Sequence, residues 1–451
     1  MSALHRWIYR GITAAIGERG LIRALRTLDE SQWEDCERLR ELQLGTLSET
    51  LRFAVTTVPA YAHLAAADDR AGASPLEALA EFPLLEKREI QHNLDSFTSR
   101  LAPSRATRKT TGGSTGQAVT ILKDREATAL ERAAMWRSYG WFGVQIGDPA
   151  ARFWGAPFAT RNRVVVRMAD LAMHRIRFSA FAFDAQDLEH YWSRCRRFRP
   201  AYLHGYVSML TEFAAFLESR GCDGGELPLK SVIATAEALS GPQKELLERV
   251  FRAPVQVEYG CGEVGPIAYS CPEGSLHLMM ENLYVEVLRE DGTTAAVGEP
   301  GEIVLTDLTN RAMPLIRYRI GDFGVPGDPC RCRRGLPTLR EVWGRAYDFV
   351  EDPEGRRYHG EFFMYLFEDL RKQGLGVHQF KVEQVGPADL RILLLHPGGT
   401  SSAQTDGLRA LLAQRLPGMQ SAITQVGELP RSPSGKMRVI ENRWRQARSA
   451  V

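Results

Sequence analysis

Eight residues near position 110 combine backbone freedom with hydroxyl groups, a combination suited to binding an anion. The segment Thr110–Gln117 reads TTGGSTGQ. Its glycines reach backbone conformations closed to other residues, so successive N–H groups can converge on one anion, and the hydroxyls of Ser114 and Thr115 add donors. It is not a Walker loop, because Gln117 follows Gly116 where that motif has lysine. The segment therefore predicts a phosphate-binding loop of another kind, with an ordinary loop as the alternative.

Three later segments place charged side chains beside glycines. Tyr259–Glu263 (YGCGE) brings an aromatic ring and a carboxylate to the end of a predicted strand, and Arg317–Asp322 (RYRIGD) ends in an acid after a glycine. Arg431–Lys436 (RSPSGK) presents one lysine on a tight loop. Taken singly, each fits a solvated carboxylate, a turn residue or a surface lysine. Their joint occurrence strengthens the prediction of a ligand site.

A second kind of chemistry is indicated by cysteines. Cys271 and His277 have the spacing Cys-x₅-His, and Cys330 and Cys332 the spacing Cys-x-Cys. Three thiolates and one imidazole form a donor set for structural Zn²⁺, if the two loops meet. Reduced cysteines and an ordinary histidine are the alternative. The odd total of seven cysteines, spread over a long chain, argues against a disulfide framework.

The elements that must position these groups alternate between strand and helix in the middle of the chain. In chain order, the predicted strands and helices are 201–206, 207–221, 231–237, 242–251 and 255–260. Such alternation implies right-handed crossovers and a parallel sheet covered on both faces. Ligands bind such sheets beyond the carboxyl ends of the strands, so we expect the functional side chains there.

The pattern predicts an α/β protein with two domains. Residues 1–345 are expected to form a large domain, with doubly covered, mostly parallel sheets plus a β-rich part that begins after residue 275. Residues 346–451 are expected to form a small α+β domain. Near the N-terminus, residues 29–55 are predicted to be one helix that ends before Pro59, because the residue before proline disfavours helix.

The composition is that of an average soluble protein. The chain has 451 residues, with 57 Lys and Arg against 55 Asp and Glu, a net charge of +2 that excludes a dominant nucleic-acid footprint. No apolar run of about 18 residues exists that could span a membrane. Residues 1–30 predict an amphipathic helix packed on its own domain, with a membrane-surface helix as the alternative. The expected location is the cytoplasm.

Six motifs in order carry a family resemblance. They are TGGSTG, SVIATAE, EYGCGE, PLIRYRIGD, GRAYDF and LPRSPSGK. The sequence resembles the adenylate-forming (AMP-binding) superfamily, and within it the phenylacetate–CoA ligase-like branch that includes CapK-type proteins. The resemblance implies an ATP-dependent acid–thiol ligase that forms an acyl-adenylate, releases pyrophosphate and transfers the acyl group to CoA. Transfer to a carrier protein or an amine, and a non-catalytic scaffold in surface-polysaccharide assembly, stay open.

The resemblance also implies roles for particular residues. Glu263 would hold Mg²⁺, and Lys436 would bridge the carboxylate and the α-phosphate, which makes these two the catalytic residues. Asp348 would be the hinge of a mobile C-terminal domain. The implied nucleotide contacts are Ser114, Thr115 and Gly116 at the phosphates, Ala236, Glu237 and Tyr259 at the adenine, Asp322 at the ribose, and Arg345 near the hinge. Gln117 and Ala118 depart from the Lys-Pro that commonly follows the glycine loop.

The acid-binding pocket of this branch draws on two aromatic segments. The matching residues are Tyr139, Phe142, His204, Gly205 and Tyr206. Flat rings there favour an aryl acid, while a medium fatty acid or an amino acid stays open. The expected cofactors are ATP, Mg²⁺ and CoA, with structural Zn²⁺ in addition, since some relatives carry a comparable cysteine site. The expected partners are a small carboxylic acid and CoA or a carrier protein, with a homodimer left open.

Overall fold

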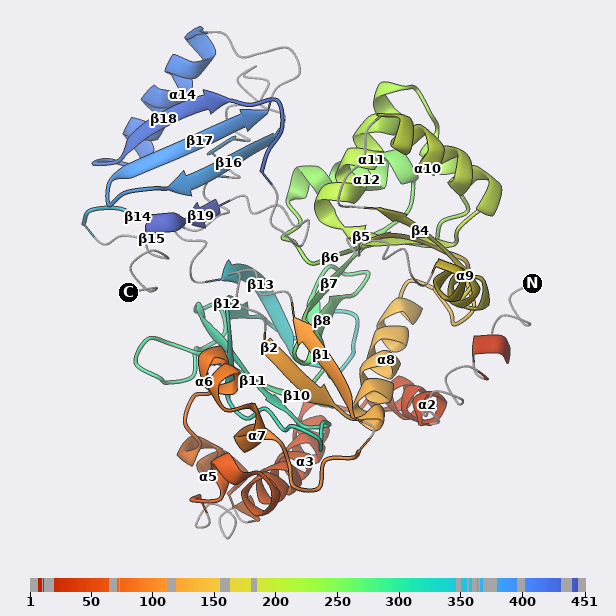
Figure 1. Cartoon of the computed structure of the whole chain (residues 1–451), viewed down its shortest axis with the longest axis vertical. Helices are drawn as coiled ribbons and strands as arrows, with labels where there is room; N and C mark the ends of the chain where they lie inside the picture. Colours follow the sequence, from red (N-terminus) through yellow and green to blue (C-terminus); the bar gives the residue numbers. More distant parts are fainter. Residues whose placement is uncertain are drawn as a thin grey trace. The chain divides into compact units, whose positions relative to one another are not determined.

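The computed structural model describes residues 7–9, 11, 20–64, 71–72, 74–104, 106–111, 119–154, 163–179, 185–345, 350–354, 357–358, 363, 366–367, 379–395, 402–430 and 440–444. The chain divides into two compact units. One comprises residues 1–320 and 324–342, and the other comprises residues 321–323 and 343–451. The two units are described separately below (Figure 1).

An 11-stranded mixed sheet organises the first unit, in the order β10-β11-β12-β13-β9-β8-β7-β6-β5-β3-β4. The strands that pair in parallel are β3 (Ala150–Trp154), β4 (Arg175–Ser179), β5 (Tyr202–Tyr206), β6 (Ser231–Thr235) and β7 (Val255–Cys261). The others are β8 (Gly265–Ser270), β9 (Leu276–Leu278), β10 (Leu283–Leu288), β11 (Gly301–Asp307), β12 (Tyr318–Pro326) and β13 (Thr338–Arg345). The predicted parallel core and the β-rich part after residue 275 are therefore both present, and they share one sheet.

Helices cover both faces of the parallel strands (Figure 1). On one face α10 (Ala185–Phe198), α11 (Val207–Ser219) and α12 (Gly241–Phe251) form an apolar core with the sheet. On the other face α8 (Arg125–Gly140) and α2 (Leu21–Ser31) pack over Tyr202 and Ile233. The sequence sets the helix starts: the Asp124 carboxylate accepts the backbone N–H of Ala127 at 2.8 Å and caps α8. The crossover connections follow from these alternating helices.

A β-hairpin brackets the glycine-rich loop. Strands β1 (Thr107–Thr111) and β2 (Val119–Lys123) pair antiparallel, so Thr111 lies opposite Val119. Around the hairpin lie α3 (Cys36–Thr57), the 3₁₀ turns Pro59–Tyr61 and Gly224–Glu226, α5 (Pro75–Glu81), α6 (Lys87–His92), α7 (Leu94–Phe97) and α9 (Arg163–Ala172). Val119 and Ile121 belong to the same apolar core as Val264 and Ile267, so the hairpin packs near the turn after β7.

The single helix predicted for residues 29–55 is wrong at its start. Helix α2 continues to Ser31, and α3 begins only at Cys36. The break arises because the Asp35 side chain accepts the N–H of Arg38 at 2.7 Å and caps a new helix. The apolar face of α2 packs into the core through Leu21 and Leu28, which agrees with the last part of the helix predicted over residues 1–30. Residues 1–6, 10 and 12–19 of that prediction lie outside the described residues. Within the described residues, no helix is long and apolar enough to cross a membrane.

The second unit is a small α+β assembly. Its four-stranded sheet has the order β18-β17-β16-β19. The elements are the two-stranded hairpin β14 (Val350–Glu351) and β15 (Arg357–Tyr358), then β16 (Gln379–Gln384), β17 (Asp389–Leu395), α14 (Ser402–Arg415), β18 (Gln420–Gln425) and β19 (Ile440–Asn442). Apolar side chains of the sheet and α14 form a separate core, including Val382, Ile392 and Leu412. This agrees with the predicted α+β texture of the C-terminal part.

Candidate functional site

A partly buried carboxylate, Glu258, lies near the carboxyl ends of the central parallel strands. Glu258 on β7 accepts hydrogen bonds from the hydroxyls of Tyr139 at 2.7 Å and Tyr269 at 3.2 Å through Oε2, and from Thr235 at 3.0 Å through Oε1. His204 Nε2 lies 3.5 Å from Glu258 Oε1. Burial alone would raise the pKa of Glu258, but the nearby His204 and the hydroxyl donors outweigh burial and hold it at about 2. Glu258 is therefore ionised at neutral pH.

His204 connects this carboxylate to an arginine and a tryptophan. Arg152 Nε donates to His204 Nδ1 at 3.1 Å, which leaves the proton of a neutral imidazole on Nε2, facing Glu258. Burial lowers the pKa of His204, and the Arg152 charge acts in the same direction. The Trp154 ring stacks on His204, with centroids 5.4 Å apart, and the Arg152 guanidinium lies 5.0 Å from the centroid of Trp154. The Trp154 ring and the Arg152 charge thus lie beside His204 near the carboxyl ends of the parallel strands.

Glu258→Gln is expected to destabilise the first unit by about 2–3 kcal/mol at pH 7, since charge-assisted hydrogen bonds become neutral ones and an amide N–H₂ faces hydroxyl donors. The folded-state pKa of Glu258 is depressed to about 2, so its contribution is present above the ordinary value of 4.5 and is lost as the pH falls towards 2. Urea unfolding at pH 7 and pH 3 measures the difference. Glu189→Gln, at an exposed position of α10, is the control. An equal effect of both substitutions would contradict the assignment.

Five residues of this cluster are absent from the sequence-based prediction: Arg152, Trp154, Thr235, Glu258 and Tyr269. The signal was available in the strand alternation. Arg152 lies opposite His204 in the β3–β5 register, and Thr235 lies opposite Glu258 in the β6–β7 register. Because side chains alternate between the faces of a strand, these residues share the face that carries His204. Their grouping depends on which strands are neighbours in the sheet, and the chain order alone does not determine this.

Only some of the predicted acid-pocket residues belong to this cluster. Tyr139 and His204 lie together, with ring centroids 6.3 Å apart, and the ring of Tyr206 lies 4.9 Å from that of Trp154. Gly205 is required by packing, because a Cβ there would come within 2.7 Å of the Phe153 carbonyl oxygen. Phe142 follows α8 and is half-buried, and among the described ring contacts none joins it to this cluster.

Glu263 occupies a buried turn beside two other functional groups. It is 5 % exposed, and its Oε1 accepts from the hydroxyl of Tyr318 at 3.4 Å. Lys87 Nζ lies 3.7 Å from the same oxygen. The neighbouring Val264 packs in one core with Val119 of the hairpin. The structure therefore brings the predicted metal-binding carboxylate and the borders of the glycine-rich loop into one region.

The predicted adenine-side residues mark the ends of β6 and β7. Ala236 has a φ of 68°, a left-handed conformation that costs an alanine about 1 kcal/mol and ends β6 at Thr235. The Glu237 carboxylate accepts the backbone N–H of Ser208 at 2.6 Å and its hydroxyl at 3.1 Å, so it ties this turn to the first turn of α11. Glu237 thereby positions the sheet edge. Tyr259 is half-buried against the core.

Of the remaining predicted residues, the structure describes two, Asp322 and Arg345. Asp322 is half-buried on β12, and Arg345 is the last residue of β13. Five predicted residues lie outside the described ones: Ser114, Thr115, Gly116, Asp348 and Lys436. Their roles stay predictions. The hairpin register nevertheless shows that the two ends of the loop containing Ser114, Thr115 and Gly116 are held together by Thr111 and Val119.

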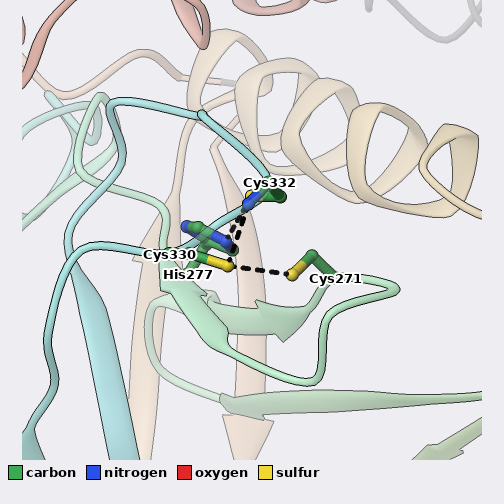
Figure 2. A group of neighbouring side chains, drawn as sticks. All are labelled: Cys271, His277, Cys330 and Cys332. Carbon is green, nitrogen blue, oxygen red and sulfur yellow. Dashed lines mark hydrogen bonds between the residues drawn. The ribbon is translucent and has the colours of Figure 1, made fainter.

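The two cysteine loops meet in the first unit, as Figure 2 shows. The ligand atoms of Cys271, His277, Cys330 and Cys332 all lie within 4.8 Å of one another. Cys271 Sγ is 3.6 Å from Cys330 Sγ, and Cys332 Sγ is 3.2 Å from His277 Nε2. Sulfur atoms at the corners of a tetrahedron with Zn–S bonds of about 2.3 Å lie about 3.8 Å apart. The separation matches a shared metal and is far too long for the roughly 2.05 Å of a disulfide bond.

The residues around the four side chains favour metal binding. His277 Nδ1 lies 3.1 Å from the Leu336 carbonyl oxygen, which fixes the ring with Nε2 towards the thiols. Burial lowers the pKa of His277 to about 4, so the imidazole is the neutral form that binds metal. Burial raises the pKa of the Cys271 thiol to about 12 in the metal-free cluster, so metal binding there displaces a proton. The Trp141 ring closes the site, 5.6 Å from His277.

Comparisons with known proteins agree with this architecture. No family model matches the chain. Protein CapK of Staphylococcus aureus is 22 % identical over 328 residues, which is 71 % of each chain. The phenylacetate–coenzyme A ligase of Pseudomonas putida is 25 % identical over 338 residues, covering 72 % of this chain and 74 % of the relative.

Solved structures extend the similarity over nearly the whole chain. A 2-hydroxyisobutyryl-CoA ligase in complex with 2-HIB-AMP has a TM-score of 0.71, with 17 % identity and 93 % of each chain covered, which shows the shared fold. The anthranilate CoA ligase AuaEII with anthranoyl-AMP has a TM-score of 0.53, with 16 % identity, and covers 76 % of this chain and 66 % of its own. The ordered motifs and these relatives agree: the chain is similar to the phenylacetate–CoA ligases and to CapK, and it shares the fold of the adenylate-forming CoA ligases.

Proposed function

We propose that this protein is an AMP-forming acyl-CoA synthetase that couples ATP to the ligation of a small carboxylic acid. A carboxylate oxygen attacks the α-phosphorus of ATP, the bond to the bridging β-phosphate oxygen breaks, and pyrophosphate leaves with the electron pair. The thiol of CoA then attacks the acyl carbonyl, gives its proton to solvent, and AMP leaves. The observation that carries this proposal is the fold match over 93 % of the chain to a CoA ligase with a bound acyl-AMP.

The residues of the chain suit this reaction by positioning and charge neutralisation, because two anions must be brought together. Glu263 would hold Mg²⁺, because its buried carboxylate offers the oxygen ligands that this cation prefers. The ammonium group of Lys87 beside it adds a positive charge where the phosphates would bind. When bound, the metal supplies charge neutralisation at the phosphate oxygens. Ser114, Thr115 and Gly116 would bind the phosphates, Tyr259 would lie near the adenine, and Asp322 would accept the ribose hydroxyls. Lys436 would contact the reacting carboxylate and α-phosphate.

A mobile C-terminal domain completes the proposal. Residues 346–451 would pivot at Asp348, next to Arg345, and present different faces in the adenylation and the thiol-transfer steps. CoA is the proposed acceptor, in keeping with a related ligase whose structure contains 2-HIB-AMP and CoA. A carrier-protein thiol or an amine would give a different product from the same acyl-adenylate, so product analysis separates these acceptors.

The proposed acid is aryl. The rings of Tyr139, His204, Trp154 and Tyr206 form a continuous aromatic series at the sheet edge. A flat acyl group gains about 0.5–1.5 kcal/mol per favourable ring contact, so aryl acids are expected to exceed aliphatic acids of equal size about 2- to 10-fold in kcat/KM. A preference for medium fatty acids or amino acids would reverse the assignment of this pocket.

A screen for acid-dependent pyrophosphate release tests the activity. Aryl, aliphatic and amino acids are incubated with the full chain, ATP and Mg²⁺, and hydroxylamine traps the acyl-adenylate as a hydroxamate. We expect release above the no-acid background with at least one acid class, and AMP in equal amount once CoA is added. Folded protein that binds ATP but releases no pyrophosphate with any acid would contradict the ligase assignment and favour a non-catalytic scaffold.

The cluster of Cys271, His277, Cys330 and Cys332 is proposed to hold one structural Zn²⁺. Its distances and donor set support a closed four-ligand site without a position for substrate. The metal would fasten the turn after β8 to the loop before β13, next to the start of β9. Its contribution would be to the stability of the large domain, with no part in the chemistry.

A further inference from the structure

We propose that Lys87 is a ligand of the β- and γ-phosphates of ATP and of the pyrophosphate product. The inference rests on the proposed ATP-dependent function, and it adds a residue from a segment outside the family motifs quoted above. The ligand is a polyphosphate with Mg²⁺, and the positive charge of the Lys87 ammonium group would bind its phosphate oxygens.

The first observation is the position of the ammonium group. Lys87 Nζ is 3.7 Å from Glu263 Oε1, with the lysine side chain 24 % exposed and the glutamate side chain 7 % exposed. At this distance the two groups form an ion pair that is longer than a normal hydrogen bond. A more highly charged anion, such as a polyphosphate, can therefore compete with Glu263 for the Lys87 ammonium group. Partial exposure lets such an anion approach the ammonium from solvent.

The second observation is that the backbone around Lys87 is fixed. Leu85 pairs with the start of β12: its N–H donates to the Arg317 carbonyl at 2.9 Å, and its carbonyl accepts the Arg319 N–H at 2.9 Å. Glu86 caps α6 through a capping box with Glu89, so the helix end is already satisfied by its own side chains. The helix terminus is therefore not the proposed phosphate ligand, and the proposal concerns the lysine ammonium that lies beside Glu263.

The third observation is a charge deficit in the glycine-rich loop. Thr110–Gln117 contains no lysine or arginine, and Gln117 follows the last glycine. ATP carries several negative charges on its β- and γ-phosphates, and one divalent cation neutralises only part of them. Phosphoryl-transfer sites commonly add a lysine for this purpose. In this chain the loop Thr110–Gln117 does not contain such a lysine, and Lys87 lies on a segment that can supply one beside Glu263.

A second lysine supports the same site. Lys109 on β1 directly precedes the loop, and its charge interacts with Cys261 and Glu263. Lys87 and Lys109, from two segments that are distant in sequence, therefore both interact electrostatically with Glu263.

The competing explanation is that Lys87 is a permanent structural counter-ion of Glu263. The two explanations differ in their dependence on the ligand. A phosphate ligand affects the binding of pyrophosphate and ATP and leaves AMP unaffected, because AMP lacks the β- and γ-phosphates. A structural counter-ion affects folding stability, and it weakens all nucleotides equally or none.

Isothermal titration calorimetry on the full chain tests the proposal with three probes: Mg²⁺–pyrophosphate, Mg²⁺–ATP and AMP. Lys87→Ala is expected to weaken pyrophosphate and ATP about 10- to 100-fold, the cost of losing a charged hydrogen-bond donor, while AMP stays within about twofold. Lys87→Arg is expected to restore most of the loss. Arg88→Ala, which removes the next cation on α6, is the control and should bind all three probes as the wild type does.

The outcomes separate this proposal from the function on which it rests. Wild type that binds neither ATP nor AMP overturns both. Wild type that binds AMP and turns over acids, with pyrophosphate binding unchanged in Lys87→Ala, overturns the Lys87 assignment alone. If Lys87→Ala does not fold, Lys87→Gln is measured instead, since its amide retains a contact with Glu263 and loses the charge. Equal weakening of AMP and pyrophosphate in that variant assigns a structural role and overturns the proposal.

Discussion

Lys436→Ala is expected to slow acyl-adenylate formation by about 10²–10³-fold, the typical cost of removing one preorganised charge from a transition state. The reason is electrostatic. As the acid carboxylate approaches the α-phosphate, two anions come together. Lys436 is the cation that the family resemblance predicts to contact both of these groups. Because it acts mainly in the transition state, ATP affinity should change only about 2- to 5-fold. Pyrophosphate release measures the rate, and calorimetry with Mg²⁺–ATP measures the binding.

Lys244→Ala provides a matched control for Lys436→Ala. Lys244 is an exposed lysine on α12 whose Nζ lies 3.8 Å from Glu248 Oε1, so its removal leaves the proposed site intact. Wild-type rates are expected for this variant. Near-normal adenylation by Lys436→Ala would remove the lysine from the mechanism. A biological role that survives Lys436→Ala unchanged would favour the scaffold alternative.

Cys332→Ser is expected to abolish stoichiometric zinc and to destabilise the first unit. Its thiolate is one of four proposed ligands, and its Sγ lies 3.2 Å from His277 Nε2. Changes outside the ligand shell already cost 10–100-fold in metal affinity, so loss of a ligand should cost on the order of 10²-fold or more. Because a structural metal contributes its binding energy to folding, Tm should fall in the variant and in chelator-treated wild type. Metal analysis and thermal unfolding are the measurements.

Cys36→Ser is the control for the metal site. Cys36 is exposed at the start of α3 and lies outside the cluster, so this variant should keep one equivalent of zinc and the wild-type Tm. Purified wild type with far less than one equivalent, and no difference between Cys332→Ser and Cys36→Ser, would contradict the zinc assignment. The four side chains would then be a buried thiol–imidazole group that contributes by packing.

These predictions share one physical basis, namely that charge is handled locally. The net charge of +2 on 451 residues offers no broad field to attract ATP. Cations must therefore be placed individually near the phosphates. Lys87 is held beside Glu263 by the pairing of Leu85 with β12, and Lys436 is predicted on a separate loop. A neutral protein of this kind should show only a modest dependence of ATP binding on ionic strength.

The order of elements was predictable from sequence because local patterns determine it. Alternating strand and helix periods placed β5, α11, β6, α12 and β7, and caps such as Asp124 set where helices begin. The helix predicted over 29–55 is wrong at its start for a local reason too, since Asp35 caps a new helix there. The glycine-rich loop, the acids and the cysteine spacings were also visible, because each is a contiguous chemical signal.

The contacts between segments distant in sequence were decided only by the tertiary structure. Cys271 meets Cys330, and Lys87 meets Glu263, through pairings that no local propensity encodes. The polar cluster around Glu258 depends likewise on β3, β5, β6 and β7 being neighbours in that order. Local chemistry specifies which groups are available, because it resides in single residues and short runs. Strand neighbourhood and register specify which groups meet, because they arise from burying the whole sheet at once.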